Sequence, residues 1–175
     1  MRKVQGNNID FALIKQDKSR IIVSFGQEAV DKKNSTWYEI DFYKKKKGSL
    51  TLDDVKQAVL GGINSLTDEK ILSGFVWNGI NVWLSAENQR NFSEAQRMAK
   101  DYGEAVLPLR FKLGEDAEGN PVYHTFNTIE ELNAFYIQAF AYVNQCLNDG
   151  WAEKDSIDWS IYKPYFPDPE IPVAE

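Results

Sequence analysis

The sequence has few of the side chains on which most catalytic and metal sites depend. Its 175 residues contain one cysteine, Cys146, and one histidine, His124. A single cysteine excludes an intramolecular disulfide, so nothing in the chain demands an oxidising compartment. A lone histidine without a partner motif is a poor candidate for a catalytic base, and one cysteine with one histidine falls short of a zinc site. We predict no catalytic, cofactor-binding or metal-ligating residues, and no enzyme.

Several other signatures are also missing. No apolar run approaches the ~18 residues of a membrane span, and the polar first eight residues contain no signal-peptide core, so we expect a cytoplasmic product without membrane contact. Gly61-Gly62 is not followed by the Lys-Ser/Thr of a phosphate loop. The acids Glu115, Asp116 and Glu118 lack the alternation and the closing glutamate of a calcium loop, so they predict an acidic turn.

Charge is spread unevenly along an acidic chain of net charge −6. Residues 1–48 hold eleven basic and six acidic side chains, a net +5, whereas residues 49–175 hold nine and twenty, a net −11. Such opposition favours oriented docking of a partner or a second subunit. Four lysines at 44–47 fit a nucleic-acid footprint, but in an acidic chain they are more typical of a solvated turn, so we do not expect nucleic acid as a partner.

The first third of the sequence has the alternation of β-strands. Residues 9–14, 20–25 and 36–43 are the expected strands. In the last of these, period-2 alternation places one set of side chains toward solvent and the other toward the core. The expected solvent set is Trp37, Glu39, Asp41 and Tyr43; the expected core set is Tyr38, Ile40 and Phe42.

Two β-hairpins are expected in the rest of the chain. Asn78-Gly79 between two apolar runs is typical of a two-residue type I′ turn, which predicts a hairpin over residues 75–84. Residues 107–112 and 122–126 form the arms of the second. Each hairpin precedes a helical pattern, which repeats a ββα-like unit.

Capping residues mark three helices. Thr51 and Thr128 each precede an acid by three residues, as in a capping box, and Ser85 can cap a helix over residues 86–100. The first helix is expected to stop near Gly61-Gly62, and the last to run to about residue 148 with Gly150 as its end. The apolar period of the last helix predicts a buried face of Ile129, Leu132, Phe135, Tyr136, Ala139, Phe140, Val143 and Leu147.

These patterns predict an α+β fold, an antiparallel sheet and β-hairpins with helices packed on the sheet. The expected divisions are N-terminal strands over 1–48, a hairpin–helix domain over 49–162 and an extended proline-rich tail over 163–175. Before the tail, a short helix or turn is expected to dock through Trp151, Ile157 and Trp159.

Aromatic residues make up 13% of the chain, which suits both core packing and partner docking. The candidate partner-docking residues are Trp37, Tyr43, Trp83, Tyr165 and Phe166. Carbohydrate binding is the alternative, because Trp37, Tyr43, Trp83 and Tyr123 on wet strand faces would stack on sugar rings.

From about residue 52 onward the chain resembles a phage and prophage domain family of unknown function found in tail and tail-fibre-associated proteins, in the versions carried by phages of gut Bacteroidales. The residues that carry the resemblance are 63–64, 71–75, 82–89, 107–108, 111–112, 123–126 and 150–159. Together they span about two-thirds of the chain and are mostly structural positions. No catalytic residue carries over, and the N-terminal strands lie outside the shared pattern.

The resemblance implies a phage virion-associated or tail-assembly protein that acts without catalysis, through protein–protein contacts. Its expected partners are other phage structural proteins or further copies of itself in an oligomer. Its expected location is the host cytoplasm during assembly and the virion afterwards. A carbohydrate-binding module that uses exposed aromatic side chains remains the alternative.

Overall fold

The structure is a computed structural model that describes residues 1–16, 20–43 and 50–166. Its helices and antiparallel sheets confirm the predicted α+β class. Two compact units are present: a sheet unit of residues 1–63 and residues from 154 onward, and a helical unit of residues 64–153. The limits of these two units differ from the expected domain boundaries at residues 48 and 162. Those domain boundaries stay predictions.

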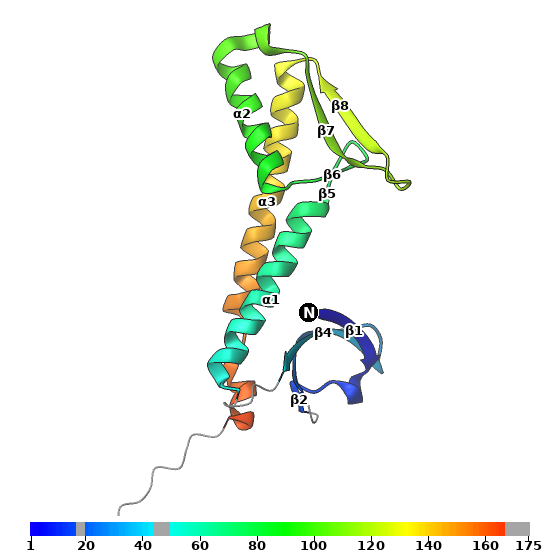
Figure 1. The fold of residues 1–175 in the computed structure, drawn as a ribbon, viewed down its shortest axis with the longest axis vertical. Helices are drawn as coiled ribbons and strands as arrows, with labels where there is room; N and C mark the ends of the chain where they lie inside the picture. The colour runs from blue at the N-terminus through cyan, green and yellow to red at the C-terminus, as the bar shows by residue number, and fades with distance from the viewer. Residues whose placement is uncertain (17–19, 44–49, 167–175) are drawn as a thin grey trace, which may run out of the picture. The chain divides into compact units, whose positions relative to one another are not determined.

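The sheet unit contains a four-stranded antiparallel sheet that curls strongly (Figure 1). Its strand order is β1-β4-β3-β2, and it holds Arg2–Asn7 (β1), Ile14–Gln16 (β2), Arg20–Ala29 (β3) and Asn34–Tyr43 (β4). The expected strand over residues 9–14 is wrong, because the 3₁₀ turn Asn8–Asp10 (η1) occupies its start. Strand β1 was not predicted, since its sequence is polar and lacks alternation.

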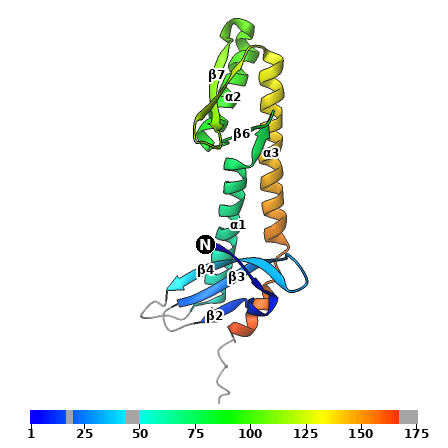
Figure 2. The same cartoon turned by 90° about the vertical axis from the view of Figure 1, so that its right-hand side faces the viewer.

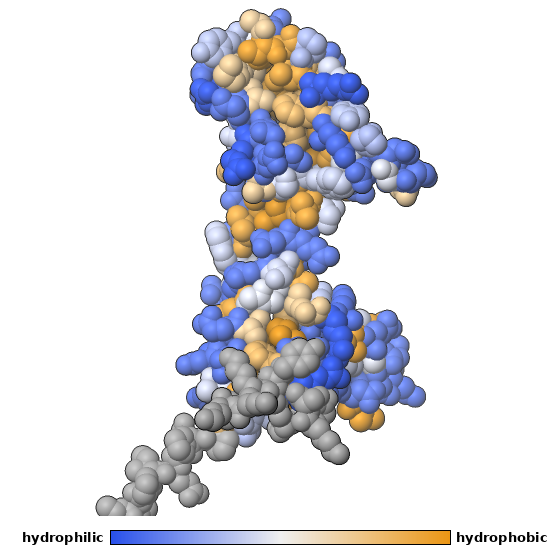
Figure 3. Space-filling view, viewed as in Figure 1, coloured by the Kyte–Doolittle hydropathy of each residue, from blue (hydrophilic) through white to orange (hydrophobic). Residues whose placement is uncertain are grey.

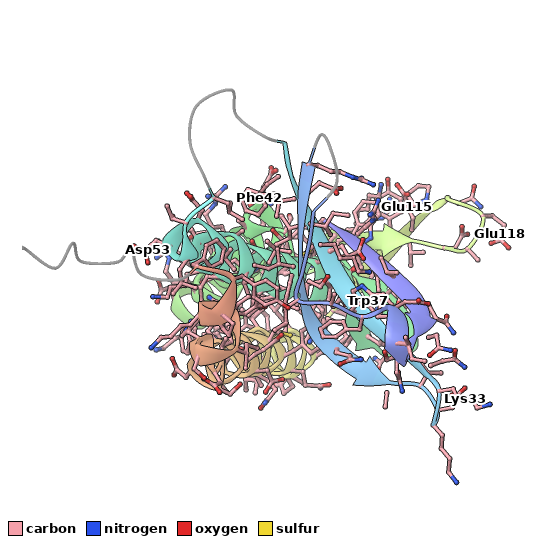
Figure 4. The ribbon with its side chains drawn as sticks, turned by 90° about the horizontal axis from the view of Figure 1, so that it is seen from below. Lys33, Trp37, Phe42, Asp53, Glu115 and Glu118 are labelled. Carbon is pink, nitrogen blue, oxygen red and sulfur yellow. The ribbon has the colours of Figure 1, made fainter. Side chains whose placement is uncertain are left out.

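Trp37 lies within the curl of these strands (Figure 4) and is only 2% exposed. The expectation of a solvent-facing Trp37 and Glu39 is therefore wrong. The ring meets Phe11 edge-on at 5.7 Å between centroids. A Cβ at Gly6 would approach the Trp37 ring to 2.7 Å, so the missing side chain at Gly6 makes room for the indole. Period-2 parity separates the two faces of β4, but it does not say which face the curl will close.

Helix α1 (Leu52–Ser73) begins with the predicted capping box. The Asp54 amide donates to Thr51 Oγ1 at 3.1 Å, and the Thr51 amide donates to Asp54 Oδ2 at 2.9 Å. The predicted stop at Gly61-Gly62 is wrong, since the helix passes through both residues. A Cβ at Gly62 would lie 2.8 Å from the Phe25 ring, so this glycine permits close packing instead of ending the helix.

The last described element of the sheet unit is the 3₁₀ helix Trp159–Tyr165 (η3). Its Tyr162 hydroxyl is buried and donates to the Ser24 carbonyl of β3 at 2.9 Å. The predicted extended tail from residue 163 is wrong as far as Tyr165, which still belongs to η3; residues 167–175 lie outside the described part, as do the lysines at 44–47. The predicted docking of Trp151 is also wrong, because it lies on the last long helix and is 54% exposed.

The helical unit holds the end of α1, two hairpins and two further long helices (Figure 2). In chain order these elements are Phe75–Trp77 (β5), Ile80–Val82 (β6), Ala86–Tyr102 (α2), Gly103–Val106 (η2), Leu109–Glu115 (β7), Pro121–Phe126 (β8) and Ile129–Asp155 (α3). Both predicted hairpins are confirmed, with Asn78 and Gly79 at positive φ in the first turn. Among the described residues, no helix is long and apolar enough to span a bilayer.

Aromatic rings form the centre of this unit. Phe135 of α3 packs against Trp77 of β5, Phe92 of α2 and Phe126 of β8, with centroids 4.9 to 5.1 Å apart. All four side chains are at most 4% exposed. One residue of α3 thus joins both hairpins and α2, so α3 lies at the centre of the core of this unit.

Candidate docking surface

Helix α3 is longer than its sequence pattern predicted. The Thr128 hydroxyl accepts from the Glu131 amide at 3.2 Å, as the capping box requires. The helix then passes through Gly150, the expected stop, and ends at Asp155. A Cβ at Gly150 would overlap Thr67 Oγ1 of α1, so this glycine allows α1 and α3 to approach closely.

Helix α2 lies alongside the first half of α3. Ser85 caps it by accepting from the Asn88 amide at 3.1 Å, as predicted. Phe92 contacts Phe135 in the interior, and the Gln96 side-chain amide donates to Asn133 Oδ1 at 3.2 Å. These contacts hold the two helices in fixed register.

A groove of about 420 Å³ lies between α2 and α3. Its lining is mostly apolar and consists of Leu84, Ala86, Gln89, Arg90, Phe92, Ser93, Tyr136, Ala139, Phe140, Val143, Asn144 and Leu147. Hydrophobic side chains gather over this part of the helical unit in Figure 3. We call this region the α2–α3 groove.

Large apolar side chains of α3 remain in solvent, one in the groove lining and one outside it. Phe140 is 60% exposed and stacks on Tyr136, with ring centroids 6.2 Å apart. Ile137 is 64% exposed. The prediction that Phe140 belongs to the buried face is wrong: the helical period places it at the margin of that face, where α2 leaves the groove open. Of the described residues that line the groove, only Arg90 carries a charge.

The candidate docking residues named from the sequence do not form this surface. Trp83 is 37% exposed, with the Lys112 ammonium 5.1 Å from its ring centroid. Tyr165 is 46% exposed and Phe166 half-buried at the end of η3, in the other unit. Trp37 is buried and offers no contact surface in this fold.

Tyr43 ends β4, and its side chain lies outside the described part of the structure. Sequence reasoning missed Ile137, and it assigned Phe140 to the core. One signal was available: residues 132–148 contain no Asp, Glu, Lys or Arg.

A polar cluster fills the curl of the sheet unit. Glu39 is 4% exposed, and its carboxylate accepts from Trp37 Nε1 at 3.0 Å and from Arg2 Nη2 at 2.6 Å, with Lys15 Nζ 3.7 Å away. Burial raises the pKa of Glu39, but the hydrogen bonds from Trp37 and Arg2 and the charges of Arg2 and Lys15 outweigh it and lower that pKa below its ordinary value. Both carboxylate oxygens accept hydrogen bonds from side chains of the same sheet unit, so the cluster stabilises the fold.

His124 pairs with one acid. Its Nε2 lies 2.8 Å from Glu131 Oε1, and its ring packs edge-on against Trp77 and Phe126. Cys146 is buried. In residues 1–16, 20–43 and 50–166, no group of three or more His, Cys, Asp and Glu side chains is placed to hold a metal ion.

The acidic turn between β7 and β8 is closed by Asp116. Its Oδ1 accepts from the amides of Glu118 and Asn120, at 3.0 and 2.7 Å. The bond from the Asn120 amide is the largest cause that lowers the pKa of Asp116.

Comparison with models of known protein families assigns the chain to one family. Residues 54–170 match the model of a family described as a domain of unknown function, DUF4376. The chain belongs to this family. The DUF4376 match covers about two-thirds of the chain, including the whole helical unit, and leaves β1–β4 outside. No curated protein and no solved structure gives a significant match.

Proposed function

We propose that this DUF4376 protein is a non-enzymatic, phage virion-associated or tail-assembly protein that works through protein–protein contacts. The observation that carries the proposal is the apolar α2–α3 groove, with Phe140 in its lining 60% exposed. A contiguous exposed apolar patch of this kind is typical of an interaction site, whereas scattered apolar side chains are normal on any surface.

The energetics favour a role in docking. Burying a large apolar side chain contributes about 1.5–3 kcal/mol. A partner that buried the exposed side chains of Ile137 and Phe140 would therefore gain several kcal/mol of binding free energy. Interface energy is concentrated in a few such anchors, and aromatic residues are prominent among them. A groove held by the α2–α3 packing is preorganised, which lowers the entropic cost of binding.

The phage context is supported by the resemblance carried by residues such as 82–89 and 150–159. The four N-terminal strands lie outside the DUF4376 match and carry a net positive charge in an acidic chain. We infer that they adapt this copy to its own partner. The protein would then be made in the host cytoplasm and retained in the finished particle.

Particle composition tests the proposal. We expect quantitative mass spectrometry of purified particles from a lysogen carrying the gene to find the chain in fixed ratio to the tail proteins. Replacing Phe140 by Ser should reduce its incorporation, whereas Tyr102→Ser, at a 63% exposed position away from the groove, should not. If particles lack the chain and form normally when the gene is deleted, the proposal is wrong.

Carbohydrate binding keeps one specific observation in its favour. Trp83 and Tyr123 are both partly exposed in the helical unit, and Lys112 lies opposite Tyr123 in the β7–β8 register and over the Trp83 ring. The guanidinium carbon of Arg110 lies over the Tyr123 ring, 4.2 Å from its centroid. A glycan array separates the two functions: binding that is lost in Trp83→Ala and kept in Phe140→Ser would favour the carbohydrate role.

A further inference from the structure

The outer side of α3 carries no charged side chain over most of its length. At the chain's 26% charged residues, the 17 residues from 132 to 148 would hold about four charged side chains, but they hold none. Buried residues of the same helix recur at Leu132, Phe135, Ala139 and Cys146. The opposite side exposes Ala134, Ile137, Ala141, Gln145 and Asn148. We call these five residues the outer face of α3.

We propose that a second copy of this chain packs on the outer face of α3 and the adjacent Phe140. This inference rests on the proposed docking role and names the occupant of that surface. Charge is the first argument. Two chains of net charge −6 repel each other over most of their surfaces, whereas the five outer-face residues are uncharged and have one acid at their end, Asp149, which accepts from Gln145 Nε2 at 2.7 Å, so this repulsion is weaker on the outer face.

The available area is the second argument. Ile137, Phe140 and Trp151 are 64%, 60% and 54% exposed. Together they offer roughly 400 Å² of side-chain surface, about half of the ~800 Å² that each partner buries in a standard interface. The groove rim and the small outer residues can supply the remainder. The uncharged run is about 25 Å long, which suits packing along a helix.

The position of Phe140 is the third argument. It is the middle residue of the uncharged run 132–148, so a two-fold axis close to it aligns the two runs along their full length. Ala134 and Ala141 are small enough for two helices to approach to the short end of the usual 8–10 Å range. An antiparallel pair also sets the two helix dipoles in opposition.

Sedimentation velocity of the purified full-length chain tests the pairing. We expect a mass of twice 20.0 kDa at about 0.1 mM protein, and a fall to 20.0 kDa for Ala141→Glu and for Ala141→Lys, each of which places like charges across the axis. A mixture of the two variants should return to the double mass, because unlike charges then meet. Tyr102→Glu is the matched control and should stay dimeric, and circular dichroism should show every variant folded.

Each other result overturns the inference. A wild-type chain that stays at 20.0 kDa excludes the second copy. A dimer that tolerates both Ala141 charges pairs through another surface. If the chain is monomeric yet present in phage particles, the docking role stands and the occupant of α3 is a different protein.

Discussion

Gly150 lies inside α3 and faces Thr67 of α1, where an added Cβ would overlap the Thr67 hydroxyl. Gly61 lies inside α1, where an added Cβ would meet no atom within 4 Å. The same substitution, Gly to Ala, should therefore stabilise the chain at Gly61 and should lose that gain, or more, at Gly150. The pair tests whether α3 really continues through Gly150 against α1.

The magnitudes follow from helix propensity and packing. Alanine is favoured over glycine by about 1 kcal/mol in a helix interior, so Gly61→Ala should stabilise the chain by about that amount and raise Tm by about 2–4 °C. Gly150→Ala gains the same propensity, but overpacking costs about 1–3 kcal/mol. We expect Gly150→Ala to be about 1–3 kcal/mol less stable than Gly61→Ala.

A double-mutant cycle isolates the contact. Thr67→Ala removes the overlapping hydroxyl, so the cost of Gly150→Ala should largely disappear in the double variant, with a coupling energy of about 1–3 kcal/mol. Urea unfolding followed by tryptophan fluorescence and far-ultraviolet circular dichroism measures all four chains. If Gly150→Ala stabilises as much as Gly61→Ala and shows no coupling to Thr67, the packing of α3 on α1 is wrong.

Three further changes test the sheet unit and the helix caps. Glu39→Gln should lower the free energy of unfolding by about 1–3 kcal/mol in urea at pH 7. Since the folded pKa of Glu39 is lowered, the wild type should lose this extra stability as the pH falls from about 5. The stability of the variant should change less with pH over that range. Burial raises the pKa of Tyr162 to about 12 from 10.0, so the free energy of unfolding should fall by roughly 2–3 kcal/mol between pH 10 and 12. Tyr162→Phe should reduce that fall in an alkaline titration. An equal fall in the variant would contradict the burial of this phenol against Ser24. Ser85→Ala should cost about 1 kcal/mol in urea unfolding, whereas Ser93→Ala, exposed on the same helix, should be neutral.

Local signals predicted most of the helical unit. Asn78-Gly79 specifies its own turn, and the hydroxyl of Ser85 satisfies a free amide three residues away, so both features depend on neighbouring residues alone. The α+β class followed from such signals. They were sufficient because none of them requires knowledge of what lies across the core.

Glycines inside the helices could not be assigned in the same way. Glycine is common at helix ends, so Gly62 and Gly150 predicted ends. In the structure each instead lies where a side chain distant in the sequence, Phe25 or Thr67, packs closely against the helix. Tertiary packing there outweighs the local preference of glycine for helix ends.

The candidate surface depends on long-range packing too. Period-2 alternation correctly put Trp37 and Glu39 on one face of β4, but the curl of the sheet decided that this face is buried. Helical periodicity assigned Phe140 to the core, whereas α2 ends its cover short of it. The uncharged run of α3 was visible in the sequence, but the uncharged run 71–86 supplies buried residues such as Phe75 and Trp77, so lack of charge alone did not identify the surface.

The central claim is that the protein works through contacts made at α3. Hydroxyl-radical footprinting compares side-chain exposure in the dilute, purified chain with exposure in intact phage particles. Ile137, Phe140 and Trp151 should be protected in particles, while Tyr102, 63% exposed in the chain alone, should react equally in both. Equal reactivity of all four side chains in both samples would contradict the account.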